Sequence, residues 1–292
     1  MVLFGLIVFL VFVITGCTPV VRQAVLPKSS NEIYVVQEGQ FYFTPEEEKF
    51  IKEEAEHLGI EVPDRKEIKR FLAYYLKNKN HLKTVFQRAK LYIPVIKPIL
   101  KEYGLPEELA YLPVIESGFN PFAVSPSGAV GLWQFMEFTA KKYGLRIDKF
   151  VDERRDVIKS THAAAKYLKD LYEEFGNWEL ALAAYNCGEG CVRRKTKGRD
   201  FWITKRNLPP ETRKYVPAFF AILLIARDVE KYGVKLPENS EKSITNKRIS
   251  SMVTVKDMVN KLGIKESVFR DMNPHIKGDF IPAGTLVYIP EE

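Results

Sequence analysis

The chain of 292 residues is 46% hydrophobic and 28% charged, which is the composition of an ordinary globular protein. It is long enough for one core of moderate size and a small second domain. Lys and Arg outnumber Asp and Glu by 44 to 37, and this mild excess suits a polyanionic partner but excludes none of nucleic acid, membrane surface or cell wall.

Residues 1–16 form an uncharged apolar run that is too short for a comfortable membrane span and about right for a signal peptide. The run ends in the sequence ITGC at residues 14–17, which resembles the lipobox of bacterial lipoproteins, although no Lys or Arg precedes it. We therefore expect a lipid anchor on Cys17, with an uncleaved anchor or plain secretion as alternatives. Thr18 stands where a retention signal would place Asp, which favours the periplasmic face of the outer membrane.

Composition divides the rest of the chain into four segments. Residues 17–44 contain prolines, serines and scattered charge without a helical period, and are predicted to be a tether. Residues 45–233 carry apolar residues three and four apart and are predicted to be a helical domain. Residues 234–243 read as a linker, and 244–292 as a small second domain.

Within the helical domain the apolar periodicity continues to its end. The first three helices are predicted between residues 45 and 104, where Gly59 and Gly104 indicate helix ends. Further helices are predicted at about 133–143, 155–175, 178–186 and 210–231.

The last segment mixes strands and helices. A strand-like stretch at 244–250 precedes helical patterns at 254–262 and 266–272 and a second strand with the sequence TLVYIP. This order resembles the LysM glycan-binding module, although the usual opening Gly-Asp-Thr turn is missing. A small α+β appendage without a ligand is the alternative. The predicted fold class is therefore mainly α, with a small α+β C-terminal module.

Cys187 and Cys191 remain once Cys17 is set aside. On a regular helix this spacing holds the Cβ atoms too far apart for a disulfide, but Gly188 and Gly190 allow a loop that could close one. A disulfide is therefore possible. We expect no metal site, because no His lies near these thiols.

Glu116 is the first candidate for chemistry. It is predicted in the last turn of a helix, against the negative end of the helix dipole, with Val114, Ile115 and Phe119 around it. Both the dipole and apolar surroundings disfavour the carboxylate and favour a protonated acid. A surface glutamate at a helix end is the commoner outcome of such a pattern.

Three other segments carry groups that suit a saccharide. The loop SPSGAVGLWQFM offers Trp133 for stacking and Gln134 for hydrogen bonding, and AAYNCGEG breaks a helix after Tyr185 and Asn186. The helix beginning with PETRKYV adds Tyr215. Each segment is a weak signal by itself, since Trp133 or Tyr215 would more often lie in a core.

Together, the ordered motifs Glu-Ser, Gly-Leu-X-Gln, Ala-Tyr-Asn and a later Tyr resemble the lytic transglycosylases of glycoside hydrolase family 23, whose fold is shared with goose-type lysozyme. The strings IESGFNPFAVSPSGAVGLWQF, VDERRD and LPPETRKYV look like the membrane-bound lytic transglycosylase D subfamily. The resemblance is strong over about residues 90–230. It implies a lysozyme-like catalytic domain.

The resemblance also implies a reaction without a second carboxylate. Glu116 would protonate the bond between N-acetylmuramic acid and N-acetylglucosamine while the sugar's acetamido group attacks, and a 1,6-anhydro ring would form. Residues that would line the subsites are Ser117, Trp133, Gln134, Tyr185, Asn186 and Tyr215. The implied partner is peptidoglycan, and no cofactor is implied.

Two other functions stay open. A lysozyme-like hydrolase would need a carboxylate that activates water, for which Asp152, Asp156 or Glu189 are candidates. A wall-binding lipoprotein without activity would explain the tether, the basic charge and the C-terminal module. A nucleic-acid partner conflicts with the export signal, and the sequence does not indicate an oligomeric state.

Overall fold

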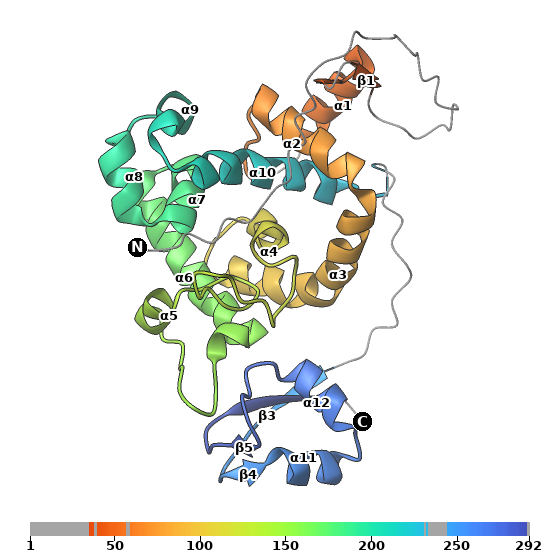
Figure 1. Cartoon of the computed structure of the whole chain (residues 1–292), viewed down its shortest axis with the longest axis vertical. Coiled ribbons are helices and arrows are strands. Elements are labelled where there is room, and N and C mark those ends of the chain that lie inside the picture. The colour runs from red at the N-terminus through yellow and green to blue at the C-terminus, as the bar shows by residue number, and fades with distance from the viewer. Residues whose placement is uncertain (1–34, 38–39, 57–58, 231, 233–243, 291–292) are drawn as a thin grey trace, which may run out of the picture.

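The computed structural model describes residues 35–37, 40–56, 59–230, 232 and 244–290 (Figure 1). The predicted signal peptide, the lipidation site Cys17 and the linker at 234–243 lie outside the described residues, and so does most of the predicted tether. Among the described residues no helix is both long enough and apolar enough to cross a membrane.

Helices dominate the part of the chain before residue 230. The α-helices of this part are α1 (Pro45–Glu56), α2 (Lys66–Lys77), α3 (Lys79–Glu102), α4 (Pro113–Glu116), α5 (Glu137–Lys142), α6 (Val157–Phe175), α7 (Trp178–Cys187), α8 (Glu189–Thr196), α9 (Phe201–Thr204) and α10 (Pro210–Arg227). Three 3₁₀ turns lie between them, η1 (Glu107–Tyr111), η2 (Glu153–Arg155) and η3 (Lys205–Asn207).

The core surrounds α10, whose residues from Val216 to Ile225 are all buried. This helix packs against α2 and α7, while α3 packs against η1 and α6. Figure 1 shows the result, with the short helix α4 held between α3 and α10. Helix α6 begins where the Asp156 carboxylate accepts the N–H of Lys159, and it ends at Gly176 in the left-handed conformation (φ 71°).

The C-terminal module has its own small core. Strand β3 (Ile244–Arg248) pairs antiparallel with β6 (Leu286–Pro290), β4 (Val253–Thr254) pairs with β5 (Phe280–Ile281), and α11 (Val255–Leu262) and α12 (Glu266–Met272) lie between them in sequence. Val255, Phe269, Ile281 and Val287 are among its buried residues. The predicted fold class, mainly α with a small α+β C-terminal part, is confirmed.

Two differences from the predicted elements have local causes. Residues 35–37 and 40–42 form the antiparallel strands β1 (Val35–Gln37) and β2 (Gln40–Tyr42), because valines and aromatics in this part of the predicted tether favour extended pairing. The glycine-rich segment after Tyr185 breaks the helix at Gly188 (φ 86°) and immediately begins α8.

Candidate active site

Glu116 is the last residue of α4, a helix of one turn that follows η1. Behind it the chain reverses through two residues with positive φ, Gly118 (59°) and Phe119 (56°). Phe119 is fully buried, and its ring stacks on that of Tyr92 with centroids 6.2 Å apart. Because a bulky residue rarely adopts positive φ, this packing contributes to holding the turn that presents Glu116.

Two tyrosines from different helices lie near the Glu116 carboxyl. The Tyr215 hydroxyl, on α10, donates a hydrogen bond to Glu116 Oε1. The Tyr185 hydroxyl, on α7, donates to the carbonyl of Trp133 at 2.7 Å. Burial raises the pKa of both phenols well above the usual value, and the Glu116 charge adds to the effect. Both phenols therefore act as donors at neutral pH.

The environment brings the pKa of the Glu116 carboxyl close to neutrality. Burial raises the pKa of its carboxyl to about 7, the Tyr215 hydrogen bond opposes this shift, and the Glu211 charge adds to it. A carboxyl with this pKa can give up a proton and take one back at neutral pH. The sequence argument for a protonated Glu116 thus has a structural basis in burial and a neighbouring acid.

The glycine-rich loop at residues 128–135 lies against Glu116's own turn. The Ser117 hydroxyl donates to the carbonyl of Leu132 at 2.9 Å. Gln134 adopts positive φ (48°) and donates its side-chain N–H to the carbonyl of Gly131 at 2.8 Å. Ser117 thus positions the loop, and Gln134 is held in a defined orientation at its end.

Trp133 does not reach the saccharide side of this loop. Its side chain is fully buried, and its indole N–H donates to the Thr161 hydroxyl of α6 at 3.0 Å. At this turn the polar side chain of Gln134 faces outward, because the larger apolar ring of Trp133 gains more free energy from burial in the core than the amide would. The predicted contact between Trp133 and sugar is therefore wrong, and Trp133 instead anchors the loop to α6.

A hollow of about 320 Å³ opens beside the loop, a size within the range of small-molecule sites. Three of the predicted groups line it, Gln134, Tyr185 and Asn186, whereas Glu116, Ser117 and Tyr215 are not among its lining residues. The other lining residues are Phe135, Met136, Thr139, Tyr167, Cys187 and Gly188. Aromatic rings beside amides are the combination that binds a sugar face and its hydroxyl groups.

Asn186 and Cys187 form one wall of this hollow, and Cys191 lies behind Cys187. The Thr212 hydroxyl donates to Asn186 Oδ1 at 2.7 Å, which ties the end of α7 to the start of α10. Cys187 and Cys191 are free thiols whose sulfur atoms lie 2.7 Å apart. Burial raises the pKa of Cys187 to about 12. The turn at Gly188 brings the thiols together, and the disulfide stays a prediction.

The three carboxylates considered for activating water each have a partner, and only Glu189 is bonded to a residue that lines the hollow. Asp152 forms an ion pair with Arg154, and Asp156 accepts the Tyr288 hydroxyl of the C-terminal module at 2.8 Å. Glu189 accepts from the Tyr167 hydroxyl at 3.3 Å.

Sequence reasoning missed Tyr167, Met136, Thr212 and Glu211 as parts of the site. The Tyr167 ring lies tilted against that of Tyr185 with centroids 5.3 Å apart, and Met136, which also lines the hollow, is 45% exposed. Tyr167 lies on a helix face that reads as core, so the sequence offers no signal for it. Glu211 could have been noticed, because it precedes Tyr215 by four residues and therefore shares a helix face with it.

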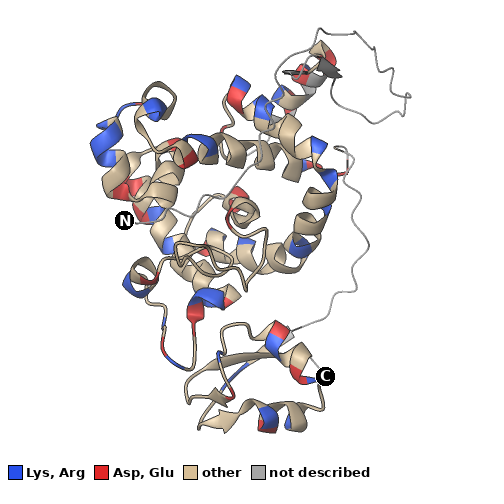
Figure 2. Ribbon diagram, viewed as in Figure 1, with Lys and Arg blue, Asp and Glu red and all other residues tan. Residues whose placement is uncertain are grey.

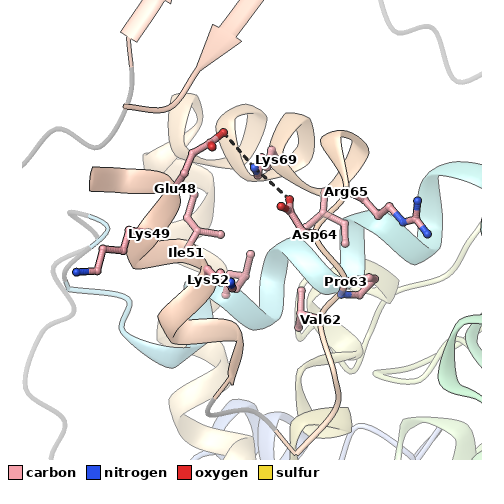
Figure 3. Close-up of a pocket in the computed structure, with 11 residues that line it drawn as sticks. Glu48, Lys49, Ile51, Lys52, Val62, Pro63, Asp64, Arg65 and Lys69 are labelled. Carbon is pink, nitrogen blue, oxygen red and sulfur yellow. Dashed lines mark hydrogen bonds and ion pairs between the residues drawn. The ribbon is translucent and has the colours of Figure 1, made fainter. Parts of the chain in front are cut away.

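A second hollow of about 290 Å³ lies between α1 and α2 (Figure 3). Its floor is apolar, and Lys69 on its wall is paired with Glu48 at 3.0 Å and with Asp64 at 3.1 Å. No predicted site residue lines it. It is therefore not the candidate active site.

Positive charge gathers on α8 and the segment that follows it (Figure 2). Helix α8 begins directly after Gly188, which lines the hollow. The exposed cations of α8 and that segment are Arg193, Arg194, Lys195, Lys197 and Arg199. Arg193 is paired with Glu174, and Asp200 caps α9. The site therefore has one flank with a net positive charge.

The sequence of the segment that carries this site is similar to those of known proteins. Residues 94–207 match the family described as the transglycosylase SLT domain. Glu116, the 128–135 loop, Tyr185 and Asn186 lie inside the matched range, while Tyr215 lies just beyond it.

Proteins similar to this chain include the membrane-bound lytic murein transglycosylase D of Escherichia coli K12, which is 35% identical over 80% of this chain and 53% of that protein. The membrane-bound lytic murein transglycosylase C of Histophilus somni is 33% identical over 42% of this chain and 39% of that protein. The chain thus spans about half the length, or less, of these relatives. Among solved structures, the 70 kDa soluble lytic transglycosylase of Escherichia coli is 22% identical, with a TM-score of 0.41, and the match covers 59% of this chain and 32% of that one.

Proposed function

We propose that this chain is a lytic transglycosylase that cleaves the β-1,4 bond between N-acetylmuramic acid and N-acetylglucosamine in peptidoglycan and leaves a 1,6-anhydro end. The observation that carries the proposal is Glu116, which is held by Tyr215, has a pKa of about 7 and lies close enough to Tyr185 for its charge to act on that phenol. Tyr185 in turn lines a hollow of small-molecule size, within the range that matches the SLT family. The names of the relatives point to the same polymer.

The first step uses Glu116 as an acid. Its carboxyl proton passes to the glycosidic oxygen, the bond from that oxygen to the anomeric carbon breaks, and the carbonyl oxygen of the 2-acetamido group attacks the anomeric carbon. The substrate thereby supplies the nucleophile that a second carboxylate supplies in a typical retaining enzyme. An intramolecular nucleophile gains from its high effective concentration.

The second step uses Glu116 as a base. Its carboxylate takes the proton of the sugar's own 6-hydroxyl, the oxygen attacks the anomeric carbon, and the bond to the acetamido oxygen breaks. The proton that Glu116 gave is restored, and no water is consumed. Tyr215 supports this cycle because its hydroxyl donates to the carboxylate that forms after the first transfer.

The remaining site residues receive roles from their positions. Gln134, Tyr185 and Asn186 line the hollow and would hold the acetamido group and the saccharide. Ser117 would act through the loop that it binds. The positive flank on α8 suits the carboxylates of the peptides attached to the glycan.

We also propose that Cys17 carries a lipid anchor, with the enzyme on the periplasmic face of the outer membrane. The C-terminal module is proposed to be LysM-like. Both rest on the sequence patterns alone.

Product analysis tests the function. Purified sacculi are digested with the wild-type chain and with Glu116→Gln, and the released fragments are examined by mass spectrometry. We expect fragments one water lighter than hydrolysis products from the wild type and none from Glu116→Gln. Glu173→Gln, the same exchange at an exposed acid of α6, is the matched control and should keep the anhydro products.

A hydrolase is the alternative that this experiment separates. Glu189 is the candidate acid that contacts a residue of the hollow, Tyr167, so a hydrolase that used it would form reducing ends and lose them in Glu189→Gln. Reducing ends would contradict the proposed reaction. Fragments released equally by Glu116→Gln would contradict its catalytic residue, and no release by the wild type would favour a wall-binding protein.

A further inference from the structure

The C-terminal module is joined to the helical domain by a continuous set of buried contacts. Ile276 pairs with Val151 as an antiparallel bridge. On either side of it, the Asp152 N–H donates to the His275 carbonyl and the Lys277 N–H donates to the Phe150 carbonyl, each at 2.8 Å. The module thus forms a β-bridge with residues 150–152, which belong to the connection between α5 and α6 (Figure 1).

Side chains extend this contact. The Tyr288 hydroxyl donates to Asp156 Oδ1 at 2.8 Å, and the Lys277 ammonium donates to the Asp148 carbonyl at 2.7 Å. Asp156 is 1% exposed and Tyr288 is 8% exposed. A buried carboxylate needs its donors, because each lost hydrogen bond leaves charge without compensation. The contact is therefore specific, unlike the loose attachment expected of a tethered binding module.

The same segment supports the 128–135 loop from behind. The Asp152 carboxylate holds Arg154 through two bonds, at 2.9 Å and 2.7 Å. Arg154 then donates to the carbonyls of Gly128 and Phe135, at 3.1 Å and 3.3 Å. These carbonyls lie at the two ends of the loop. Gly131, in its middle, packs so closely that an added Cβ would lie 1.9 Å from the Arg154 carbonyl.

Asp156 provides a second route to the loop. Its carboxylate also caps α6 through the Lys159 N–H at 2.9 Å, and α6 carries Thr161, which holds the Trp133 indole. The loop is therefore fixed between the residue 152–161 region on one side and Ser117 and Tyr185 on the other.

We propose that the C-terminal module is a clamp that positions the substrate loop, with Tyr288 and Asp156 as positioning residues for the chemistry at Glu116. In this role the module acts on every substrate, including glycans too short to reach it. A module that only binds glycan would act on long strands alone. The link to catalysis rests on the proposed function, but the link to the loop does not.

The test combines loop dynamics with activity in the full chain. Hydrogen exchange is followed in peptides covering residues 128–135 and, as an internal reference, α10. We expect Tyr288→Phe to speed exchange in the loop by about threefold or more without changing α10, because loosening one contact promotes local opening. Met252→Ala, at a module residue that is 55% exposed, is the matched control and should leave both unchanged.

Activity is measured on a tetrasaccharide of alternating N-acetylmuramic acid and N-acetylglucosamine. Because misplacement of binding groups lowers the rate of the chemical step, kcat should fall about tenfold in Tyr288→Phe while Met252→Ala keeps the wild-type value. Asp156→Ala should have a larger effect on both readouts. Asp156→Asn, which retains an acceptor oxygen for Tyr288 and Lys159, should restore most of the loss.

Unchanged loop exchange in Tyr288→Phe and Asp156→Ala would overturn the clamp, whatever the activity. Loss of activity on long strands combined with normal kcat on the tetrasaccharide would also overturn it. If the wild type forms no anhydro product, the proposed function fails while the exchange measurement still decides the clamp.

Discussion

Replacing Tyr215 by Phe removes one hydroxyl and keeps the ring. Tyr215 is 8% exposed on α10, so Phe fills the same buried space. The lost group is the donor to Glu116 Oε1. A hydrogen bond to the charged form of an acid lowers its pKa. The variant should therefore raise the pKa of Glu116 above about 7.

The size of this shift follows from the strength of the bond. Hydrogen bonds to charged groups contribute about 1.5–3 kcal/mol, and one pKa unit corresponds to about 1.4 kcal/mol. Removal of the Tyr215 hydroxyl should raise the pKa of Glu116 by about one to two units. A compensating water would reduce the shift toward the lower end of this range.

The pH dependence of kcat/KM measures the shift. Glu116 begins the reaction protonated, so activity is present below its pKa and is lost as the pH rises through it. The basic limb should lie near pH 7 in the wild type and move upward in Tyr215→Phe. Tyr103→Phe, whose hydroxyl contacts His162 instead, should leave the limb in place. A basic limb that stays or moves downward in Tyr215→Phe would refute the assignment of Glu116 as the acid.

Three further predictions concern stability and redox chemistry. Glu116→Gln should raise the free energy of unfolding at pH 8 by up to about 3 kcal/mol but not at pH 4. The carboxyl has a pKa of about 7 in the folded chain against an ordinary 4.5, so above pH 4.5 its ionisation favours the unfolded chain, and glutamine removes this effect. Urea titrations at both pH values check the sign, and an equal gain at pH 4 would contradict it. Gly131→Ala should lower the free energy of unfolding by more than 3 kcal/mol, because the added Cβ would meet a backbone carbonyl. Gly128 has the same φ of 86° but open space around it, so Gly128→Ala should cost only about 1–2 kcal/mol. Similar thermal unfolding midpoints for the two variants would show that the loop moves to accommodate the Cβ at position 131. Exchange with a small-molecule disulfide should oxidise Cys187 and Cys191 to an intramolecular disulfide, detected as the loss of two hydrogen masses that dithiothreitol reverses, and two mixed disulfides in its place would count against closure.

Local chemistry explains which features the sequence could predict. The apolar period of α6 and α10 and the caps at Asp156 and Gly176 are encoded within a few residues, so these helices are predicted well. Glu116 was found through its motif, since its neighbours in sequence support a protonated acid only weakly. Its strongest structural support comes from Tyr215, 99 residues away.

Features that depend on packing could not be predicted. Trp133 and Gln134 are adjacent polar and aromatic residues in one loop, and only the tertiary structure decides that the ring turns inward and the amide outward. The contact between Tyr288 and Asp156 joins residues 132 apart. Neither residue carries a local signal, and the composition of the last segment suggests an independent module.

The strained backbone at two turns of the candidate site has a consequence for directed evolution. Phe119, in the turn behind Glu116, and Gln134, beside the hollow, adopt positive φ, and such conformations cost of order 1–3 kcal/mol each. Selection for thermal stability alone would reward glycine at position 134 and at the same time discard the amide that faces the hollow. Heat tolerance and the proposed cleavage of glycan are thus opposing selection criteria at this position, and a library screened for both should retain Gln134.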